Sequence, residues 1–199
     1  MSLKISPLFL TRGVPGTHDT KMIANCIYKL KKARFKKFSI PRFDKSIDDR
    51  LPKKNWQKIQ KKPEIVIFEG WCVGVKSQKT KDLNKPINLL EKQKDKKKVW
   101  RNYVNEELKT NYKKIFNLID TYIFLKVPSF RYVYKWRFLQ EKKLSLVSKG
   151  KKIMSKRQIQ NFIMFYERLT KHMLKNFPKK TKFLINIDNN HKLKSIKYY

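Results

Sequence analysis

The sequence predicts an α/β protein in which a mainly parallel sheet is flanked by helices. Short apolar runs rich in β-branched and aromatic residues alternate with long amphipathic stretches, and proline or glycine punctuates the apolar runs. Alternation of this kind is typical of parallel sheets, because two parallel strands need a crossover connection that is usually a helix. With 199 residues the chain is predicted to form a single domain, residues 1–199 with a tail from about residue 189, that buries about 70% of its unfolded surface.

The central predicted strand follows Pro63 and contains four consecutive apolar residues, 65–68. Such a run is typical of a strand that is covered on both faces. Glu69 and Gly70 end it, and ligands in parallel sheets lie at the carboxyl ends of strands. Glu69 could therefore hold a Mg²⁺-bound water or polarise a substrate, or it could be a solvated carboxylate at the end of a core strand. The residues leave both alternatives open.

The chain before this strand begins with a shaped loop, because residues 11–19 contain two glycines and a proline. A helix is predicted from Thr17–Asp19 to about Arg34 on the spacing of its apolar residues. A short extended piece follows at residues 38–44, and residues 45–62 are predicted to be a surface excursion.

The second half of the chain carries the strongest periodic signals. The apolar stripe over residues 99–119 predicts a helix. The other predictions are, in order, a loop at 73–98 with one short helical turn, a buried strand at 121–127, a helix from Ser129 to about 147, a basic hinge at 149–152, a helix from Ser155 to Pro178, a strand at 183–188 and a polar tail.

Composition restricts the class of protein. Cys26 and Cys72 are too few and too far apart for a metal site or a disulfide framework, which fits a reducing compartment. No apolar run approaches the length of about 18 residues that a membrane span needs, and the first residues lack the apolar core of a secretion signal. The sequence therefore predicts a cytoplasmic protein.

The formal net charge of +35 is the most unusual bulk property. Such a charge attracts polyanions, so a basic RNA-binding or ribosome-associated protein is one alternative. Lysine greatly outnumbers arginine, however, and Ile, Asn, Phe and Tyr are abundant, as in proteins encoded by AT-rich genomes. Dispersed lysines would then form an ordinary solvated surface, and the two alternatives differ in whether the charge gathers in one continuous stripe.

Charged residues gather near the predicted loops and strand ends. They form three groups: Arg12, His18 and Asp19; Arg42 and Asp44, with Asp49 and Arg50; and Glu69. Guanidinium groups beside carboxylates suit a small anionic, hydroxylated substrate, because arginine can bind a carboxylate or phosphate through two hydrogen bonds. Each group can instead be an ordinary ion pair.

Several blocks of the sequence closely resemble the D-glycerate 3-kinases. The blocks are Arg12-Gly13-Val14-Pro15-Gly16-Thr17-His18-Asp19, Pro41-Arg42-Phe43-Asp44, Asp48-Asp49-Arg50, Phe68-Glu69-Gly70-Trp71-Cys72-Val73-Gly74, Trp100-Arg101-Asn102-Tyr103-Val104-Asn105, Val127-Pro128-Ser129-Phe130, Trp136-Arg137, Gln140-Glu141 and Phe165-Tyr166-Glu167-Arg168-Leu169-Thr170. The resemblance extends from about Pro7 to Asp188.

This resemblance implies a P-loop NTPase-like fold and transfer of the γ-phosphoryl group of ATP, with Mg²⁺, to D-glycerate to give 3-phosphoglycerate. It implies that Glu69 is the acidic residue of a Walker-B-type strand near Mg²⁺. It also implies that Arg137 is a lid arginine over the transferring phosphate. The implied acceptor-site residues are Arg12, His18, Asp19, Arg42 and Asp44.

One signature of the resembled family is absent from the sequence: no Gly-x-x-x-x-Gly-Lys-Ser/Thr motif occurs in it. We therefore expect a fold that is incomplete at its N-terminus, with the P-loop in a separate N-terminal segment or lost from a truncated gene model. Because phosphoryl transfer depends on that loop, this chain alone is expected to be inactive, or a catalytically dead kinase relic. The missing strand would lie between the strand ending at Glu69 and the strand at 121–127, leaving two unpaired apolar edges.

Overall fold

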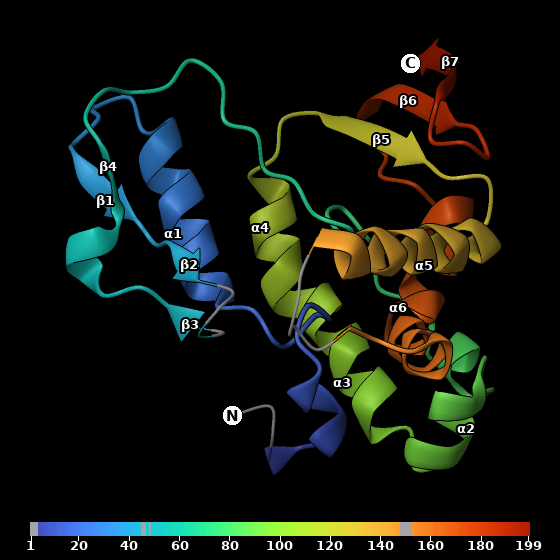
Figure 1. Cartoon of the computed structure of the whole chain (residues 1–199). Coiled ribbons are helices and arrows are strands. Elements are labelled where there is room, and N and C mark those ends of the chain that lie inside the picture. The colour runs from blue at the N-terminus through green and yellow to red at the C-terminus, as the bar shows by residue number, and fades with distance from the viewer. Residues whose placement is uncertain (1–3, 45–46, 48, 148–152) are drawn as a thin grey trace. The chain divides into compact units, whose positions relative to one another are not determined.

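The computed structural model describes residues 4–44, 47, 49–147 and 153–199, and it divides into two compact units (Figure 1). The first unit contains Met1–His18 and Gly70–Tyr199, and the second contains Asp19–Glu69. The predicted basic hinge at 149–152 lies outside the described residues. The single-domain organisation stays a prediction.

The second unit consists of one helix and two small antiparallel ribbons. Helix α1 (Thr20–Lys31) begins directly after Asp19, whose carboxylate accepts a hydrogen bond from the backbone N–H of Met22 at 3.0 Å. This confirms the predicted helix. The ribbons pair β1 (Phe38–Ile40) with β4 (Gln57–Ile59) and β2 (Phe43–Asp44) with β3 (Asp49–Arg50), and a short 3₁₀ turn spans Lys53–Asn55.

The predicted central strand at residues 64–68 is wrong. The segment forms no strand, and Ile65 and Ile67 are 78% and 86% exposed. Four apolar residues in a row indicate a strand that is buried on both faces, but a strand also needs a neighbour to accept and donate its backbone hydrogen bonds. No described segment pairs with these residues, so they form no inter-strand backbone hydrogen bonds of a sheet. Glu69 is exposed at their end.

The first unit contains most of the helices. They are the 3₁₀ turns Pro7–Leu10 and Thr80–Leu83, helices α2 (Leu89–Lys94), α3 (Val99–Glu107), α4 (Lys113–Asn117), α5 (Phe130–Val147) and α6 (Lys156–Lys175), and a π-helical turn, Leu108–Tyr112, that joins α3 to α4. The predicted helix over 99–119 is therefore confirmed as one continuous helical stretch. No described helix is long and apolar enough to cross a membrane.

Two helices begin where the sequence predicts, and one of these boundaries has a complete capping box. Ser155 caps α6 with both hydrogen bonds of a capping box, which involve Gln158. Helix α5 begins directly after Ser129, as expected. The region 73–98 is more ordered than the predicted loop, because it contains a 3₁₀ turn and α2, and Val75, Leu83 and Leu90 are buried.

The described residues of the first unit form one three-stranded sheet. Strand β5 (Tyr122–Lys126) pairs with β6 (Thr181–Ile187) in parallel, and β6 pairs with β7 (Leu193–Tyr198) in antiparallel. The strands predicted at 121–127 and 183–188 are confirmed. The predicted polar tail is wrong in part, because it contains β7, and the sheet is mixed where a mainly parallel sheet was expected.

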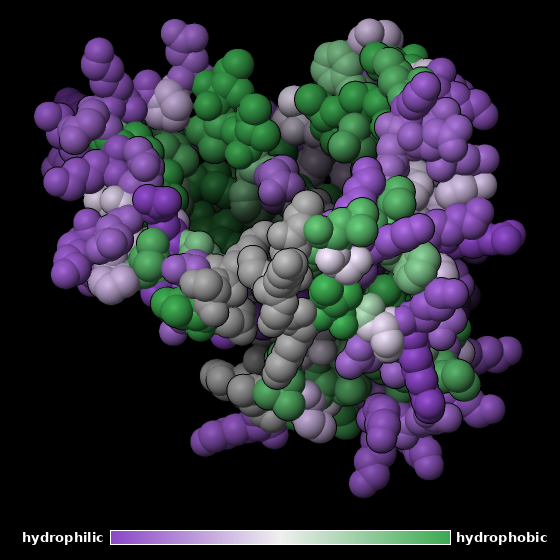
Figure 2. All heavy atoms as spheres, viewed as in Figure 1, coloured by the Kyte–Doolittle hydropathy of each residue, from purple (hydrophilic) through white to green (hydrophobic). Residues whose placement is uncertain are grey.

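One face of this sheet is apolar and exposed. Directly paired residues share a face, and the register pairs Ile123 with Phe183 and Phe183 with Tyr198. Ile123 and Leu125 are 62% and 60% exposed, which corrects the prediction that the strand at 121–127 is buried. Apolar side chains lie open over these strands in Figure 2, at the upper right. The opposite face contributes Phe124 and Leu184 to the interior.

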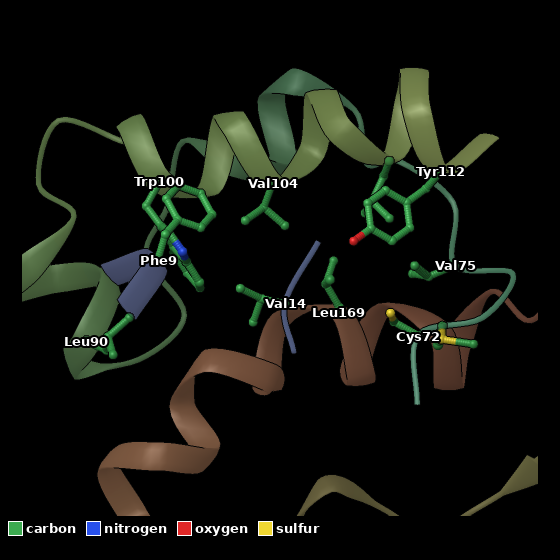
Figure 3. Packing of buried hydrophobic residues seen from close by; sticks show 11 residues of the cluster. Phe9, Val14, Cys72, Val75, Leu90, Trp100, Val104, Tyr112 and Leu169 are labelled. Atoms are coloured by element: carbon green, nitrogen blue, oxygen red, sulfur yellow. The ribbon is translucent and has the colours of Figure 1, made fainter. Parts of the chain in front are cut away.

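The core of the first unit lies between α3 and α6. The N-terminal segment with Phe9 and Val14 passes between these helices and packs against Val104 and Leu169 (Figure 3). Val14 has no exposed surface. The loop that begins at Arg12 is thus anchored in the core by its own apolar residue.

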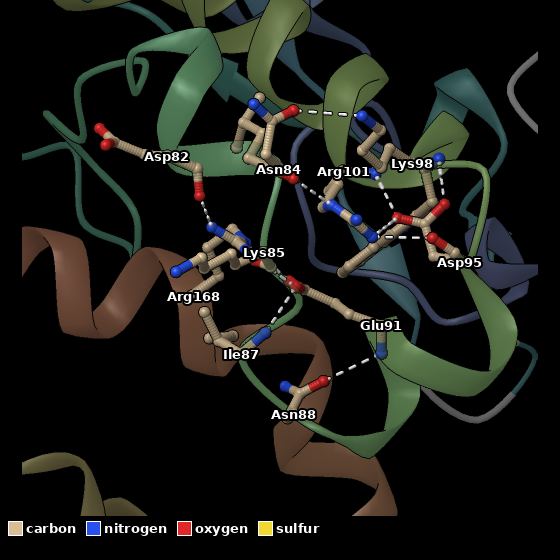
Figure 4. Close-up of polar contacts among 12 residues, drawn as sticks. Asp82, Asn84, Lys85, Ile87, Asn88, Glu91, Asp95, Lys98, Arg101 and Arg168 are labelled. Atoms are coloured by element: carbon tan, nitrogen blue, oxygen red, sulfur yellow. Dashed lines mark hydrogen bonds and ion pairs between the residues drawn. The ribbon is translucent and has the colours of Figure 1, made fainter.

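Two buried ion pairs connect α6 and α3 to the segment of residues 82–95 (Figure 4). Arg168 of α6 pairs with Glu91 of α2 at 2.6 Å, and Arg101 of α3 pairs with Asp95 at 2.9 Å. Both guanidinium groups also donate to backbone carbonyls in residues 82–95. These arginines, which belong to the blocks that resemble glycerate kinases, are therefore used inside the fold.

Candidate functional site

The loop from Arg12 to His18 is held in one shape by hydrogen bonds within itself. The N–H of Gly13 donates to Oγ1 of Thr17 at 2.9 Å, and this hydroxyl donates to the carbonyl of Val14 at 2.8 Å. Gly16 has a φ of 100°, and a Cβ there would lie 2.9 Å from the ring of Tyr103. Glycine is required at this position because a side chain would be both strained and crowded.

Two aromatic side chains support the outer side of the same loop. The indole N–H of Trp71 donates to the carbonyl of Gly13 at 2.7 Å, and the hydroxyl of Tyr166 donates to the carbonyl of Arg12 at 3.0 Å. The two rings meet edge to face with centroids 4.9 Å apart. The loop backbone therefore presents the exposed side chain of Arg12 from a fixed base.

His18 lies at the other end of the loop and is joined to Tyr112. Its Nδ1 lies 2.5 Å from the Tyr112 hydroxyl, which also accepts a hydrogen bond from the N–H of Gly16 at 3.3 Å. Tyr112 is buried, while part of His18 remains exposed. Desolvation lowers the pKa of His18, and burial raises the pKa of Tyr112. The imidazole is thus favoured in its neutral form and the phenol in its protonated form.

Arg137, the predicted lid arginine, lies on α5 and has partners in this structure. It donates to Oε1 of Gln140 at 2.6 Å, forms an ion pair with Glu141, and lies 5.5 Å from the centre of the Phe162 ring. Its Nε is buried and has no hydrogen-bond partner among the described residues. The guanidinium is therefore held by two side chains of its own helix and by the ring of Phe162 on α6.

A hollow of about 520 Å³ lies beside Arg137. It is lined by residues of α5 and one residue of the β6–β7 turn: Val133, Trp136, Arg137, Leu139, Gln140, Lys143 and His191. The rings of Trp136 and His191 have centroids only 3.8 Å apart. The hollow thus combines aromatic surface with two cationic side chains, a composition that suits an aromatic anion.

The remaining predicted site residues belong to the second unit. Asp19 caps α1 with one oxygen and pairs with Arg50 through the other at 3.0 Å, so both its oxygens have structural partners. Arg42 is exposed and Asp44 is half-buried, on or beside β2. The ion pair between Asp19 and Arg50 joins residues of two of the predicted charged groups.

Glu69 is exposed and follows no strand, so the predicted position at a strand end is wrong. No cluster of three or more His, Cys, Asp or Glu side chains occurs in the described part of the chain. Mg²⁺ in kinases needs only one or two carboxylates, because phosphates and water supply the other ligands. A single carboxylate such as Glu69 meets this requirement, but it does not meet that of a metal site built from several protein ligands.

Sequence reasoning missed Tyr112 and His191. Tyr112 belongs to the apolar stripe that predicts the helix, and its polar end gave no separate signal. The only available signal was general: a buried tyrosine hydroxyl needs a hydrogen-bond partner. His191 is exposed, and the sequence does not show the pairing of β6 with β7 that brings it to Trp136.

The chain has clear relatives among kinases. It is 32% identical over 177 residues to an uncharacterized kinase, mug58, of Schizosaccharomyces pombe, which covers 81% of this chain and 58% of that protein. It is 27% identical over 162 residues to the chloroplastic D-glycerate 3-kinase of Arabidopsis thaliana, with 78% of this chain and 32% of that protein covered. This chain is a homologue of the D-glycerate 3-kinases. No protein-family model matches it.

Solved structures show the same relationship at the level of the fold. The D-glycerate 3-kinase of Cryptococcus neoformans var. grubii superposes with a TM-score of 0.80 at 21% identity, over 100% of this chain and 72% of that one. The YGR205w protein superposes with a TM-score of 0.71 at 24% identity, over 98% and 69%. The glycerate-kinase homologue described here therefore has the α/β fold of these proteins and spans about a third to three fifths of the length of its curated relatives.

Proposed function

We propose that this chain supplies the acceptor-binding and lid parts of an ATP-dependent kinase of the D-glycerate 3-kinase type. The reaction converts ATP and D-glycerate to ADP and 3-phosphoglycerate. The observation that carries the proposal is the sequence relationship to the D-glycerate 3-kinase of Arabidopsis thaliana, which includes most of this chain. The rigid loop with Arg12 and His18 at its two ends supports it.

In this proposal Arg12 binds the carboxylate of D-glycerate, since a guanidinium can donate two parallel hydrogen bonds to it. His18 contacts an oxygen of the acceptor. The backbone N–H of Gly13 already donates to Thr17 inside the loop, and that of Gly16 donates to the hydroxyl of Tyr112. The loop therefore acts through its side chains and differs from a phosphate-binding glycine loop. Asp19, Arg42 and Asp44 remain proposed acceptor-site residues.

ATP would use the hollow on α5. The rings of Trp136 and His191 offer apolar surface for a purine, and Lys143 and Arg137 offer positive charge for phosphates. Arg137 would exchange Glu141 for the transferring phosphoryl group, where a finger-like arginine is worth about 10³ to 10⁵ in rate. Glu69 would contribute one ligand to Mg²⁺, which neutralises charge on the phosphates.

In this proposal the P-loop comes from a separate segment, because no Gly-x-x-x-x-Gly-Lys-Ser/Thr occurs in the printed sequence. The edge of β5 that pairs with no described strand, together with the exposed side chains of Ile123 and Leu125, offers that segment a place to add a strand and cover the sheet. The chain without that segment is expected to show no useful turnover.

Calorimetric titration of D-glycerate into the chain tests the acceptor part of this proposal. Binding should weaken about tenfold or more in Arg12→Ala, since a charged hydrogen-bonded contact is lost. Arg157→Ala, an exposed arginine on α6, serves as the control and should leave the affinity unchanged. Equal affinity of the parent and Arg12→Ala would remove Arg12 from the acceptor site. RNA binding that falls steeply with salt and ignores ATP would favour a basic RNA-binding protein instead.

A further inference from the structure

Tyr112 and His18 are remote from each other in the sequence and form a hydrogen bond. The hydroxyl oxygen of Tyr112 lies 2.5 Å from Nδ1 of His18 and 3.3 Å from the backbone nitrogen of Gly16. Tyr112 is only 4% exposed and ends the π-helical turn between α3 and α4. Turns of this kind are rare and occur frequently at functional sites.

The direction of this hydrogen bond follows from counting protons. A tyrosine hydroxyl has one proton to donate and can accept hydrogen bonds at its oxygen. The oxygen of Tyr112 accepts the N–H of Gly16, and the only described acceptor for its proton is Nδ1 of His18. Burial keeps the phenol protonated by raising its pKa. The hydroxyl of Tyr112 therefore donates to Nδ1.

Burial disfavours the opposite direction, in which Nδ1–H of His18 donates to the hydroxyl oxygen of Tyr112. If Nδ1 carried the proton, the oxygen of Tyr112 would accept both hydrogen bonds and its own proton would have no acceptor among the described residues. A buried donor without a partner is costly. Cys72 and Glu107 also act on the pKa of Tyr112, but neither has a described hydrogen bond to its hydroxyl.

We propose that Tyr112 is a positioning residue that fixes His18 as the tautomer with its proton on Nε2. Nε2–H is then a hydrogen-bond donor, so His18 binds an oxygen of the ligand and cannot remove a proton from it while Nδ1 is occupied. A neutral Nε2–H donor selects a carboxylate or hydroxyl oxygen as its partner. That the ligand is D-glycerate rests on the proposed function, whereas the tautomer does not.

Nuclear magnetic resonance of the full chain with ¹⁵N-labelled histidine tests this inference. The chain has three histidines, and loss of signals in His18→Gln identifies those of His18. At a pH where the ring is neutral, the expected pattern has a protonated Nε2 and an unprotonated Nδ1. In Tyr112→Phe we expect a mixture of both tautomers and a higher pKa of His18, because a hydrogen bond to the neutral ring is lost.

Tyr166→Phe is the matched control. It removes another tyrosine hydroxyl that supports the same loop, the one that donates to the carbonyl of Arg12, and should leave the His18 tautomer unchanged. A protonated Nδ1 in the parent chain would overturn the inference, and so would an unchanged tautomer in Tyr112→Phe. If Tyr112→Phe fails to fold, the spectrum of the parent chain decides.

The same samples separate this inference from the proposed function. Addition of D-glycerate should shift the Nε2–H signal of His18 if the acceptor is bound there. A single Nε2–H tautomer without that shift would contradict the assignment of His18 to the acceptor site and leave the role of Tyr112 intact. A mixture of tautomers together with that shift would contradict the role of Tyr112 and leave the assignment of His18 to the acceptor site intact.

Discussion

Arg168 and Glu91 form an ion pair in the interior, with Nη2 and Oε2 separated by 2.6 Å and side chains that are 7% and 0% exposed. The pair ties α6 to α2, and the same guanidinium donates to the carbonyls of Asp82 and Lys85. A block that resembles glycerate kinases thus contains a residue whose partners are structural.

Glu91→Ala tests the contribution of this pair to stability. The substitution leaves the charge of Arg168 buried without its carboxylate, so the free energy of unfolding should fall by about 3–5 kcal/mol. Glu106→Ala removes an exposed partner of Lys109, 4.0 Å away, and should cost less than about 1 kcal/mol. Denaturant unfolding measures both. Similar small losses in the two variants would show that the buried pair is dispensable.

Gly74→Ala should destabilise the chain strongly. Gly74 has a φ of 82°, and a Cβ there would lie 2.5 Å from Pro178 and 2.7 Å from Tyr122. Strain of this backbone kind costs about 1–3 kcal/mol before the clash is counted. Gly70→Ala is the control, because its Cβ would meet only Val73, at 3.1 Å. A melting temperature that falls equally in both variants would contradict this explanation.

Acid should weaken the fold through His18 and His172. Desolvation lowers the pKa of both rings in the folded state, so the unfolded chain binds more protons below its own pKa of about 6.5. Stability is therefore fully present above that pH and is lost as the pH falls below it. The double variant His18→Gln, His172→Gln should show a smaller loss between about pH 7 and pH 5. An identical pH dependence of unfolding in parent and variant would show that these rings are not responsible.

Elements with a complete pattern in their own residues could be predicted from the sequence. The stripe over 99–119 and the Ser155 cap each specify a helix locally, and 183–188 has the composition of a strand. The predicted strand at residues 64–68 is wrong because an apolar run indicates burial but does not show whether a neighbouring strand is there to pair with it. Strand β7 was missed for a related reason: its side chains are all exposed, so its formation depends on pairing with β6.

The candidate site divides in the same way. The glycines and proline of residues 11–19 predict a shaped loop, and the structure shows the hydrogen bonds that hold it. The role of Asp19 as a helix cap could have been read from its position before α1. Two contacts join segments that are distant in the sequence: His18 with Tyr112, and Trp136 with His191. No local sequence pattern predicts them.

Arg137→Ala should reduce kcat far more than it raises KM in an enzyme that is complete with its P-loop. A finger-like arginine stabilises charge on the transferring phosphoryl group, and its loss costs about 10³ to 10⁵ in rate. Arg131→Ala, an exposed arginine of the same helix, is the control and should retain the parent kcat. If Glu141→Gln lowered kcat as much as Arg137→Ala, the ion pair on α5 would explain the loss and the lid role would be abandoned.

The most direct test of the proposed function is turnover in a complete enzyme. The chain is fused to the part of the Schizosaccharomyces pombe kinase that lies outside the matched region, and the products from ATP and D-glycerate are followed by ADP release and ³¹P resonance. We expect 3-phosphoglycerate from the hybrid and none from the chain alone. A folded hybrid that binds ATP but transfers no phosphoryl group to D-glycerate would contradict it.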